Sequence, residues 1–509
     1  MKWLGKIFGR VILVSVAIAL QLAFLFVFIF QLSAYYLPVT LIMSAISLLA
    51  SLVIINRPGN PAVKMAWIVP ILVFPLFGGV VYFISGGKGP KKKLLKAMDK
   101  SEQALRSYRE DGTEALQALE MQDPLRAGQF RYLYNHGFPV YQNTVATYYS
   151  DGYSTWKQML EDLETAERFI FLEYFIISPG QMWDAILDVL ARKAGDGVDV
   201  RILYDDVGSI QCLPHKYPDQ LRQMGIHCVA FNRYRPVYSA VMNHRDHRKI
   251  MVIDGRVGYT GGINLADEYI GAVESCGVWK DNGLRLAGDA VRSMTRMFVH
   301  VWNAVSPHDQ IEAGERLPLR ASEGKVVSDG YVQPYGDSPV DNELIGGNVY
   351  LNMINQATKY VYICTPYVVL DHETERALCL ATRRGVDVRL VVPGIPDKKF
   401  VYHLTKSHFP ELIANGVKVY RFNEGFVHAK CFVADDAQAV VGTINLDYRS
   451  LMLHFENGVL FGHHPVVAAV KADFEDMFAR CELVENRKRR FNLLYEFYLS
   501  LLRLLAPLM

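Results

Sequence analysis

The sequence predicts an α/β protein made of two similar halves, and two observations lead to this prediction. A set of polar residues recurs in the same order 181 positions later: His247, Lys249, Asp254 and Asn264 are repeated as His428, Lys430, Asp435 and Asn445. The second observation is the repetition of longer apolar stretches, such as GVDVRILYDD (197–206) and GVDVRLVVPG (385–394). Self-similarity on this scale indicates two like domains rather than an array of short repeats.

Each half has the pattern of a strand, a helix and a second strand. The stretches RFIFLEYFII (168–177) and KYVYICTPYVV (359–369) are rich in β-branched and aromatic residues, which predicts matching strands. Helices are predicted over Ala185–Ala194 and Glu375–Arg384, ahead of the two GVDVR strands. Such alternation favours α/β layers around a mostly parallel or mixed sheet.

The N-terminal region is apolar enough to enter a membrane. Residues 11–56 contain no charged side chain. A helix of this length would reach about 70 Å, far more than the roughly 30 Å hydrocarbon core of a bilayer. We therefore expect two transmembrane spans, Val11–Phe30 and Leu37–Ile55. A cleaved signal peptide is the alternative, but its apolar segment would be only about 7–15 residues long.

A third uncharged segment lies between Lys64 and Lys88 and is interrupted by prolines and glycines. Basic residues flank all three segments, and basic flanks favour the cytoplasm. Two crossings followed by a re-entrant segment satisfy this preference; three crossings with the N-terminus outside are the competing interpretation. Both predict a multi-pass protein of the cell membrane whose bulk, with the duplicated motif, lies on the cytoplasmic side.

These features divide the chain into five parts. They are a membrane anchor (1–86), a charged helical connector (87–135), the first half (136–322), the second half (323–484) and a basic amphipathic C-terminal helix (485–509). The last helix follows four consecutive basic residues and is expected to lie on an anionic membrane surface. Its packing on the protein core is the alternative.

Composition narrows the class of partner and cofactor. The formal net charge is only +2, so the chain has no strong basic field for nucleic acid. Its seven cysteines include no CxxC pair, which predicts a reduced compartment with neither a disulfide framework nor a zinc site. We expect no metal and no other cofactor.

The residue types of the duplicated motif suit phosphoryl transfer through histidine. Alternation along a strand would place each histidine and the lysine two residues later on one face. A neutral imidazole can attack phosphorus to form a covalent phosphohistidine, and a second histidine can protonate the departing alkoxide. Lysine and asparagine side chains can donate to the phosphoryl oxygens. One half supplies too few groups for this chemistry, so the two halves are expected to share one site.

The pattern HxKxxxxDxxxxxxG[GST]xN, present twice, resembles the phospholipase D superfamily. Longer strings, among them LYDDVGS, GGINLADEY and GTINLDYRSLMLHFENGV, narrow the resemblance to the cardiolipin synthases. The resemblance implies two duplicated phospholipase D-like domains with one active site at their interface, preceded by N-terminal transmembrane helices. It also implies a metal-free phosphatidyltransferase that acts on phosphatidylglycerol in anionic membranes, forms cardiolipin and releases glycerol.

Carried over by position, the resemblance implies a catalytic motif and a phosphate-binding pair. The motif residues are His247, Lys249, Asp254, His428, Lys430 and Asp435, and the substrate-binding residues are Asn264 and Asn445. Within the motif, Asp254 and Asp435 are expected to be structural, accepting hydrogen bonds from backbone donors at the strand end. Gly262 stands where serine is frequent, which puts one phosphate contact of the first half in doubt.

Relatives carry an acidic residue about 25–35 positions beyond each histidine, which orients the imidazole. Asp281 and Glu456 occupy such positions and are predicted as the orienting acids, with Glu456 as the partner of His428. The resemblance implies that His247, the first-half histidine, is the nucleophile, and the charges of Arg245 and Arg248 would in addition favour its neutral form. His428 would then act as acid and base.

Other functions of the same residues remain open at this stage. A membrane-bound phospholipase D hydrolase would use water as the acceptor, and another phosphatidyltransferase of the superfamily would use a different alcohol. A nuclease would need a basic groove and has little use for a membrane anchor. A non-catalytic lipid scaffold would be indicated by loss of a motif residue, and both motifs are intact.

Overall fold

The computed structural model of the protein describes residues 23, 33–74, 78–79, 82, 92–108, 111–214, 216–234, 243–312, 314, 328–341, 343–485 and 492–508. The described residues form two compact units. The smaller unit contains the N-terminal helices and the C-terminal helix. The larger unit contains the described residues of 92–233 and 245–490, and with them both halves of the repeat.

The smaller unit is a helical hairpin with a third helix against it. Helix α2 (Ser33–Asn56) is followed by α3 (Pro61–Val73), and Asn60 caps α3 by accepting a hydrogen bond from the backbone N–H of Ala62. The two helices pack together around buried isoleucines. Helix α19 (Leu493–Leu505) and the short turn after it (Ala506–Leu508) pack against α3.

Helix α2 has the length and the apolar composition of a membrane-spanning helix. Within the described residues, Leu37–Asn56 is the one helical stretch that is long and apolar enough to cross a membrane. It coincides with the predicted span Leu37–Ile55, and many of its large apolar side chains are exposed. Helix α3 is apolar but shorter. The predicted span Val11–Phe30 lies almost wholly outside the described residues.

The segment predicted as a charged connector is helical but is part of the larger unit. It forms α5 (Lys92–Leu105), a 3-10 turn (Arg106–Tyr108), α6 (Thr113–Gln122) and α7 (Pro124–Asn135). Helix α5 packs on a central helix, α12 (Val291–Val305). Leu119 and Phe130, from α6 and α7, are fully buried in the core of the second half. These helices therefore contribute to the core of the larger unit.

The first half is built on a seven-stranded mixed sheet in the order β1-β9-β7-β6-β2-β3-β4. The strands are β1 (Thr144–Tyr149), β2 (Phe169–Tyr174), β3 (Asp199–Asp205), β4 (His227–Phe231), β6 (Lys249–Ile253), β7 (Val257–Gly261) and β9 (Gly283–Gly288). Its helices are α8 (Gly152–Glu164), α9 (Gln181–Gly195), α10 (Asp206–Ser209), α11 (Tyr217–Gln223) and α12.

The second half repeats this order as β10-β17-β16-β15-β11-β12-β13 and adds β18 at the edge. The strands are β10 (Tyr331–Asp337), β11 (Tyr360–Cys364), β12 (Asp387–Pro393), β13 (Lys418–Phe422), β15 (Cys431–Ala434), β16 (Gln438–Gly442), β17 (His454–Gly462) and β18 (Glu482–Leu483). Its helices are α14 (Ile345–Gln356), α15 (His372–Arg383), α16 (Lys399–Ala414), α17 (Tyr448–Met452) and α18 (Val466–Arg480).

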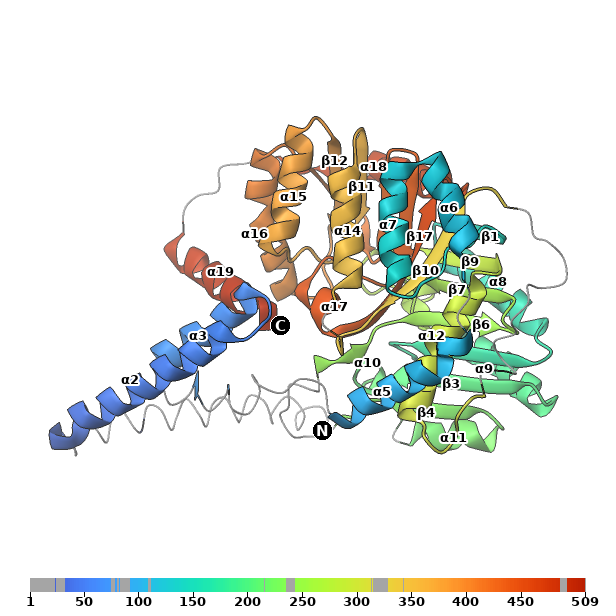
Figure 1. The fold of residues 1–509 in the computed structure, drawn as a ribbon, viewed down its shortest axis with the longest axis horizontal. Helices are drawn as coiled ribbons and strands as arrows, with labels where there is room; N and C mark the ends of the chain where they lie inside the picture. The colour runs from blue at the N-terminus through green and yellow to red at the C-terminus, as the bar shows by residue number, and fades with distance from the viewer. Residues whose placement is uncertain are drawn as a thin grey trace. The chain divides into compact units, whose positions relative to one another are not determined.

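The two sheets confirm the predicted duplication and the α/β class. Strands β2, β3 and β4 are parallel to one another, as are β11, β12 and β13, whereas the other strands in the shared order pair antiparallel. Figure 1 shows α7, α14 and α15 side by side along the second sheet. The predicted helices Ala185–Ala194 and Glu375–Arg384 correspond to α9 and α15, and each starts a few residues earlier than predicted.

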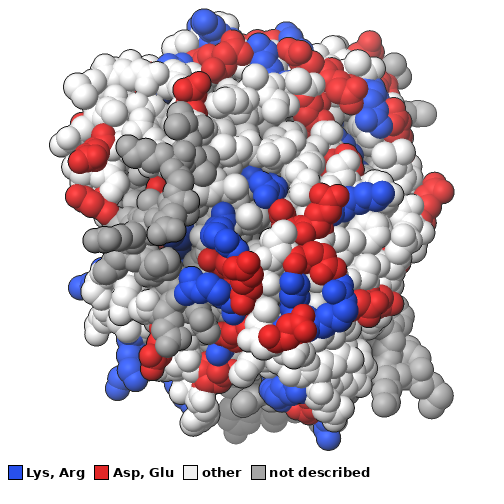
Figure 2. All heavy atoms as spheres, turned by 90° about the vertical axis from the view of Figure 1, so that its right-hand side faces the viewer, with Lys and Arg blue, Asp and Glu red and all other residues white. Residues whose placement is uncertain are grey.

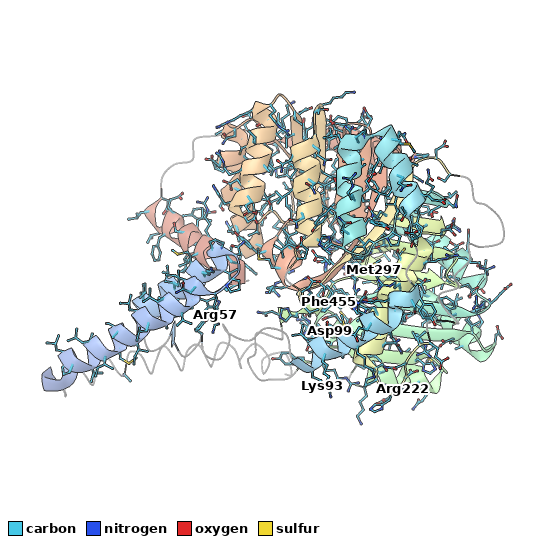
Figure 3. The ribbon with its side chains drawn as sticks, in the orientation of Figure 1. Arg57, Lys93, Asp99, Arg222, Met297 and Phe455 are labelled. Atoms are coloured by element: carbon cyan, nitrogen blue, oxygen red, sulfur yellow. The ribbon has the colours of Figure 1, made fainter. Side chains whose placement is uncertain are left out.

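Short strand pairs join the two halves. Strand β5 (Arg245–Asp246) pairs in parallel with the start of β17 in the second half. Strand β8 (Val278–Lys280) pairs in parallel with β14 (Gly425–Val427) in the same way. An apolar core also crosses the boundary: Met297 from α12 and Phe455 from β17, both labelled in Figure 3, belong to one buried cluster.

The charged surface is mixed in sign. On the face drawn in Figure 2, basic and acidic side chains lie close together without a continuous basic stripe. The seven cysteines are all free thiols.

Candidate active site

The two motif histidines are buried where the halves meet. His247 lies just before β6, and His428 lies between β14 and β15, so both precede the motif strand rather than lying within it. Each backbone N–H is held by the opposite half: His247 donates to the carbonyl of Phe455 at 2.9 Å, and His428 donates to the carbonyl of Lys280 at 2.7 Å. These two bonds continue the β5–β17 and β8–β14 pairings.

The orienting acids are exchanged between the halves. Nδ1 of His247 lies 2.9 and 3.0 Å from the carboxylate oxygens of Glu456, and Nδ1 of His428 lies 2.7 Å from Oδ2 of Asp281. The predicted pairing of Glu456 with His428 is therefore wrong. Both acids are fully buried.

The exchange follows from the strand pairing. Because each histidine N–H binds the carbonyl of the residue immediately before an acid of the opposite half, that acid is the carboxylate within reach of its ring. A carboxylate at Nδ1 fixes the tautomer that leaves Nε2 as the free nitrogen. Each of the two histidine–carboxylate pairs is thus built from both halves.

Each motif lysine lies close to the motif histidine of its own half. Lys249 Nζ donates to the carbonyl of His247 at 2.7 Å, and Lys430 Nζ donates to the carbonyl of His428. Both side chains are buried. Burial lowers the pKa of Lys249 to about 7 and that of Lys430 to about 8, although Glu456 and Asp281 raise both. The lysine charge is therefore available below these values and is lost as the pH rises through them.

These pKa values predict an alkaline decline in activity. Below about pH 7 both ammonium groups can bind an anionic phosphodiester, and above about pH 8 first Lys249 and then Lys430 become neutral. We expect kcat/KM to fall with rising pH over this range, because kcat/KM reports groups of the free enzyme. A pH profile from 6 to 10 on phosphatidylglycerol vesicles tests this, with Lys249→Arg, in which only Lys430 still titrates, as the comparison. A profile that stays flat to about pH 10 would contradict it.

The histidines are held neutral by their surroundings. Burial lowers the pKa of His247 well below its usual value, and the charges of Lys249 and Lys430 lower it further. Burial also lowers the pKa of His428 to about 4, although Asp281 opposes this shift. Burial would raise the pKa of Asp281, but the contacts with His428 and Lys430 hold it below its usual value.

The two arginines beside His247 have a different role from the one expected. Arg245 Nε donates to Asp205 at 2.9 Å, and Arg248 pairs with Glu173 at 2.6 Å. Both guanidinium groups are buried in these ion pairs. The charges that keep His247 neutral come from the motif lysines, so the expectation for Arg245 and Arg248 is corrected.

Asp254 and Asp435 lie at the far ends of the motif strands. Asp254 accepts backbone N–H donors of residues 167, 168 and 169, and Asp435 accepts those of residues 358, 359 and 360. Both adopt positive φ, at 54° and 56°. These bonds fix the start of β2 and of β11. Both residues thus make the hydrogen bonds to backbone donors that the sequence analysis expected of them.

The two asparagines differ in their bonding. Asn264 donates from Nδ2 to the Tyr269 hydroxyl at 2.6 Å and accepts the backbone N–H of Ile176 at 3.1 Å. Oδ1 of Asn445 is buried and has no hydrogen-bond partner among the described residues. An amide carries two N–H donors and one acceptor oxygen, so Asn264 retains one N–H for a ligand.

The carboxylates are supported unequally. Glu456 accepts the hydroxyl of Thr443 at 2.5 Å and the hydroxyl of Ser450 at 2.6 Å. Asp281 accepts the backbone N–H of Asn282 at 2.8 Å, and Gly262 stands at the position of Thr443. The Thr443 hydroxyl therefore serves the orienting acid, which explains why its absence at Gly262 need not cost a phosphate contact.

Gly262 has no room for a side chain. A Cβ built there would lie 1.9 Å from Oδ1 of Asp281. We expect Gly262→Ala to displace this carboxylate from His428 and to lower kcat by about 10²-fold, since the carboxylate fixes the imidazole tautomer. Gly128→Ala in α7, where a Cβ meets nothing within 4 Å, is the control. Equal activity of the two variants would show that Asp281 can move without consequence.

Aromatic rings surround each histidine. Phe175 lies 4.9 Å and His454 lies 5.5 Å, between ring centroids, from His247. Tyr269, Trp279 and Phe426 lie 5.4 to 5.9 Å from His428. Sequence reasoning did not identify this lining. One signal was present, since Trp279 and His454 each stand two residues before an orienting acid.

The tyrosines at matching strand ends also differ. Tyr174, at the end of β2, is buried in the core of the first half. Tyr367 is half-buried and donates to Asp397 at 2.5 Å.

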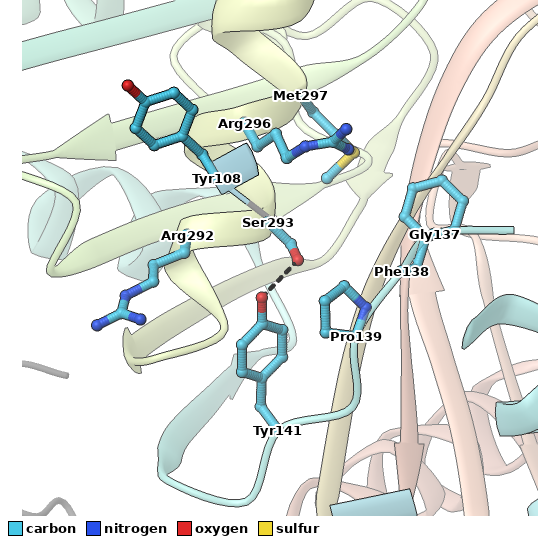
Figure 4. A pocket seen from close by; sticks show the side chains of 9 residues that line it. All are labelled: Tyr108, Gly137, Phe138, Pro139, Tyr141, Arg292, Ser293, Arg296 and Met297. Atoms are coloured by element: carbon cyan, nitrogen blue, oxygen red, sulfur yellow. Dashed lines mark hydrogen bonds between the residues drawn. The ribbon is translucent and has the colours of Figure 1, made fainter. Parts of the chain in front are cut away.

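A small surface pocket lies apart from these residues. It is formed by α12, the 3-10 turn after α5 and the loop after α7. On its wall the hydroxyls of Tyr141 and Ser293 are joined by a hydrogen bond of 2.9 Å (Figure 4). None of the duplicated-motif residues or orienting acids lines it.

Comparisons with known proteins find matches to two family profiles. A sequence profile described as "Cardiolipin synthase, PLD-like domain" matches residues 159–302 and 350–478, and one described as "Phospholipase_D-nuclease N-terminal" matches residues 45–87. The chain is 43% identical over 426 residues to an uncharacterised protein of Streptococcus mutans, covering 84% of this chain and 92% of the relative.

Relatives with a named activity match at greater distance. A cardiolipin synthase of Geobacillus kaustophilus is 33% identical over 484 residues, covering 92% of this chain and 93% of the relative. One of Alkalihalophilus pseudofirmus is 33% identical over 461 residues, covering 88% and 90%. The crystal structure of phosphatidylserine synthase of Haemophilus influenzae shares the fold, with a TM-score of 0.56, 16% identity, and coverage of 75% of this chain and 98% of that one.

The cardiolipin synthase profile spans more than half of the chain, in two segments that carry the two motifs. The apolar helix α2 and the match to the N-terminal profile indicate association with a membrane. With its two buried histidine–carboxylate pairs, the chain belongs to the cardiolipin synthase family of phospholipase D-like proteins.

Proposed function

We propose that this protein is a cardiolipin synthase that transfers a phosphatidyl group from one phosphatidylglycerol to a hydroxyl of another. The observation that carries the proposal is the pair of buried histidine–carboxylate dyads shared between the halves, with a lysine beside each. Relatives that match over most of this chain are named cardiolipin synthases, which supports the choice of reaction.

His247 is proposed as the nucleophile. Its neutral imidazole attacks phosphorus, the bond from phosphorus to the glycerol oxygen breaks, and a phosphatidyl-histidine forms. His428 supplies the proton that glycerol needs to leave, because the bound anionic phosphodiester raises the pKa of a neighbouring imidazole. In the second step His428 takes a proton from the hydroxyl of the second phosphatidylglycerol, whose oxygen displaces His247. Each step conserves charge and protons.

The unequal carboxylates support this assignment. The Glu456 charge is shared with the hydroxyls of Thr443 and Ser450, so it attracts a proton to His247 less strongly. Within the described part of the chain, no hydroxyl donates to Asp281, which suits a histidine that must gain and return a proton. Rapid quenching with labelled phosphatidylglycerol, followed by peptide mapping, tests the assignment. A label on His428 alone would reverse it.

Phosphate binding is proposed for Lys249, Lys430, Asn264 and Asn445. The two ammonium groups and the free amide donors are suited to the charge that develops on the phosphoryl oxygens. This chemistry needs no cofactor, since the lysines supply the positive charge that a metal ion would supply elsewhere.

Incubation of purified protein with labelled phosphatidylglycerol, with and without EDTA, tests the function. We expect cardiolipin and free glycerol in equal amounts, and no loss of activity when EDTA is added. Phosphatidic acid as the main product would favour a hydrolase. Loss of activity on chelation, with recovery when magnesium or zinc is added, would disprove the metal-free mechanism. A phospholipase D hydrolase is the alternative, since every residue of the site would serve water as the acceptor equally well.

The membrane arrangement is proposed as multi-pass with the larger unit in the cytoplasm. Exposed apolar side chains on α2 support insertion of this helix, and the short α3 suits a segment that returns without crossing. Helix α19 carries exposed Leu493, Leu494 and Phe497 and packs on α3, which supports a place at the membrane boundary.

Deletion of residues 1–86 should separate anchoring from folding. We expect the shortened chain to stay folded, because the larger unit begins at Lys92. It should lose resistance to alkaline carbonate extraction, and any peripheral binding through the basic C-terminal tail should weaken in high salt. Extraction of the full chain and the shortened chain in parallel is the measurement. Equal resistance of both would disprove the anchor.

A further inference from the structure

A third histidine lies beside the proposed nucleophile. His454 is buried on β17, with its ring centroid 5.5 Å from that of His247 and 6.4 Å from that of Phe175. Neither of its ring nitrogens has a hydrogen-bond partner among the described residues. Burying a polar group without a partner is unfavourable, so such an imidazole indicates a ligand that is bound at times.

The surrounding donor atoms have the spacing of a metal site. Within the described residues, His247, His454 and Glu456 offer one ligand atom each, all within 4.8 Å of one another. Nδ1 of His247 lies 2.9 Å, and Nδ1 of His454 lies 3.7 Å, from Oε1 of Glu456. Tetrahedral zinc with bonds of about 2.0–2.1 Å separates its ligand atoms by about 3.3 Å, which lies between these two distances.

The ligand set also suits zinc in kind. Two imidazoles and one glutamate form a frequent protein set for zinc that leaves the fourth position open. Glu456 has capacity for the ion, because a carboxylate offers about four lone-pair sites and the hydroxyls of Thr443 and Ser450 occupy two. The imidazole of His247 faces the remaining lone pairs of the Glu456 carboxylate, and a zinc ion there would replace the Nδ1 proton of His247.

The other half-site lacks this third ligand. Gly261 pairs with Gly283 in the first sheet, and Gly442 pairs with Gly458 in the second, so the two sheets align Asp281 with Glu456. Two residues earlier, the first half has Trp279 where the second has His454. The duplication therefore provides one His–His–carboxylate cluster per chain, on the His247 side.

We propose that His247, His454 and Glu456 form an inhibitory zinc site that blocks the nucleophile. Zinc binds Nδ1 of His247 in place of its proton, which is released to solvent, and withdraws electron density from the imidazole, so that Nε2 becomes a poor nucleophile. The ion is an inhibitor and not a cofactor, so the proposed reaction proceeds without it. The inhibition rests on the proposed role of His247, whereas zinc binding itself does not.

Zinc binding and zinc inhibition should be measured separately on the full chain in detergent. Titration with Zn²⁺ alone is expected to give about one tight site per chain, and Co²⁺ in its place should give the visible bands of a tetrahedral site. Zn²⁺ should inhibit phosphatidyl transfer with the same affinity, and EDTA should reverse it. No tight site in the unaltered protein would overturn the proposal.

His454→Phe keeps a ring of similar size and removes the ligand. We expect it to weaken zinc affinity and zinc inhibition together by at least about tenfold, while transfer in metal-free buffer changes little. His454→Asn is the second variant, and its melting temperature shows whether loss of binding reflects unfolding. Binding and inhibition that are unchanged in both folded variants would overturn the assignment of His454.

Trp279→His provides the converse test. It places an imidazole two residues before Asp281, beside His428, as His454 stands beside His247. A second zinc equivalent in this folded variant would support the geometric argument. Tight zinc binding in His247→Ala at the affinity of the unaltered chain would locate the ion elsewhere and overturn the proposal, whether or not the protein makes cardiolipin.

Discussion

His247→Ala and His428→Ala are each expected to lower kcat for cardiolipin formation by about 10⁴- to 10⁶-fold, because the two histidines act as one unit. Both side chains are buried at the junction of the halves, and their removal leaves the backbone bonds to Phe455 and Lys280 intact. The variants should therefore remain folded and membrane-bound, which circular dichroism and carbonate extraction would show.

The double variant should be no slower than the slower single variant, since loss of either histidine already stops the reaction. Initial rates with labelled phosphatidylglycerol in mixed micelles provide the measurement. His372→Ala, on the surface helix α15 and away from both motifs, is a suitable control. Activity of more than a few per cent in either single variant would count against a shared site.

Glu456→Gln and Asp281→Asn are expected to lower kcat by about 10²- to 10⁴-fold each, because a neutral amide cannot hold the imidazole tautomer or stabilise its charged form. The structure also predicts which histidine each change affects. Asp281→Asn should lower the pKa of His428 from its value of about 4, since Asp281 raises that pKa through its charge and hydrogen bond. Glu456→Gln should leave the Nδ1–H of His428 unchanged.

Nitrogen and proton NMR of the two imidazoles distinguishes the exchanged pairing from pairing within each half. The downfield Nδ1 proton of His247 should change in Glu456→Gln and persist in Asp281→Asn, and the converse should hold for His428. A matched pair of variants thus serves as its own control. If each acid affected the histidine of its own half, the exchange would be disproved.

The fold and the motif residues could be predicted because both leave a local signal in the sequence. Apolar strands, helical segments and a polar motif in register revealed two α/β halves, and the longer strings identified the family. The structural role of Asp254 and Asp435 could also be predicted, since each stands at the end of an apolar strand.

The partners of the histidines could not be predicted in the same way. Glu456 is only 28 positions beyond His428, yet it bonds to His247, which is 209 positions away. Nothing local indicates that β5 pairs with β17 across the two halves. Likewise, the charges of Arg245 and Arg248 are visible in the sequence, but their buried partners Asp205 and Glu173 come from distant strands.

The exchange of acids has a consequence for the order in which the protein is made. Ribosomes add about 5–20 residues per second, so the 209 residues between His247 and Glu456 take roughly 10–40 s to synthesise. During that time the chain already has its membrane segment and His247, the proposed nucleophile, but not the carboxylate that binds its Nδ1. A nascent or prematurely terminated chain therefore sits among its lipid substrates without being able to attack them. Synthesis of the last strands completes both dyads and makes the enzyme active only when translation is nearly finished.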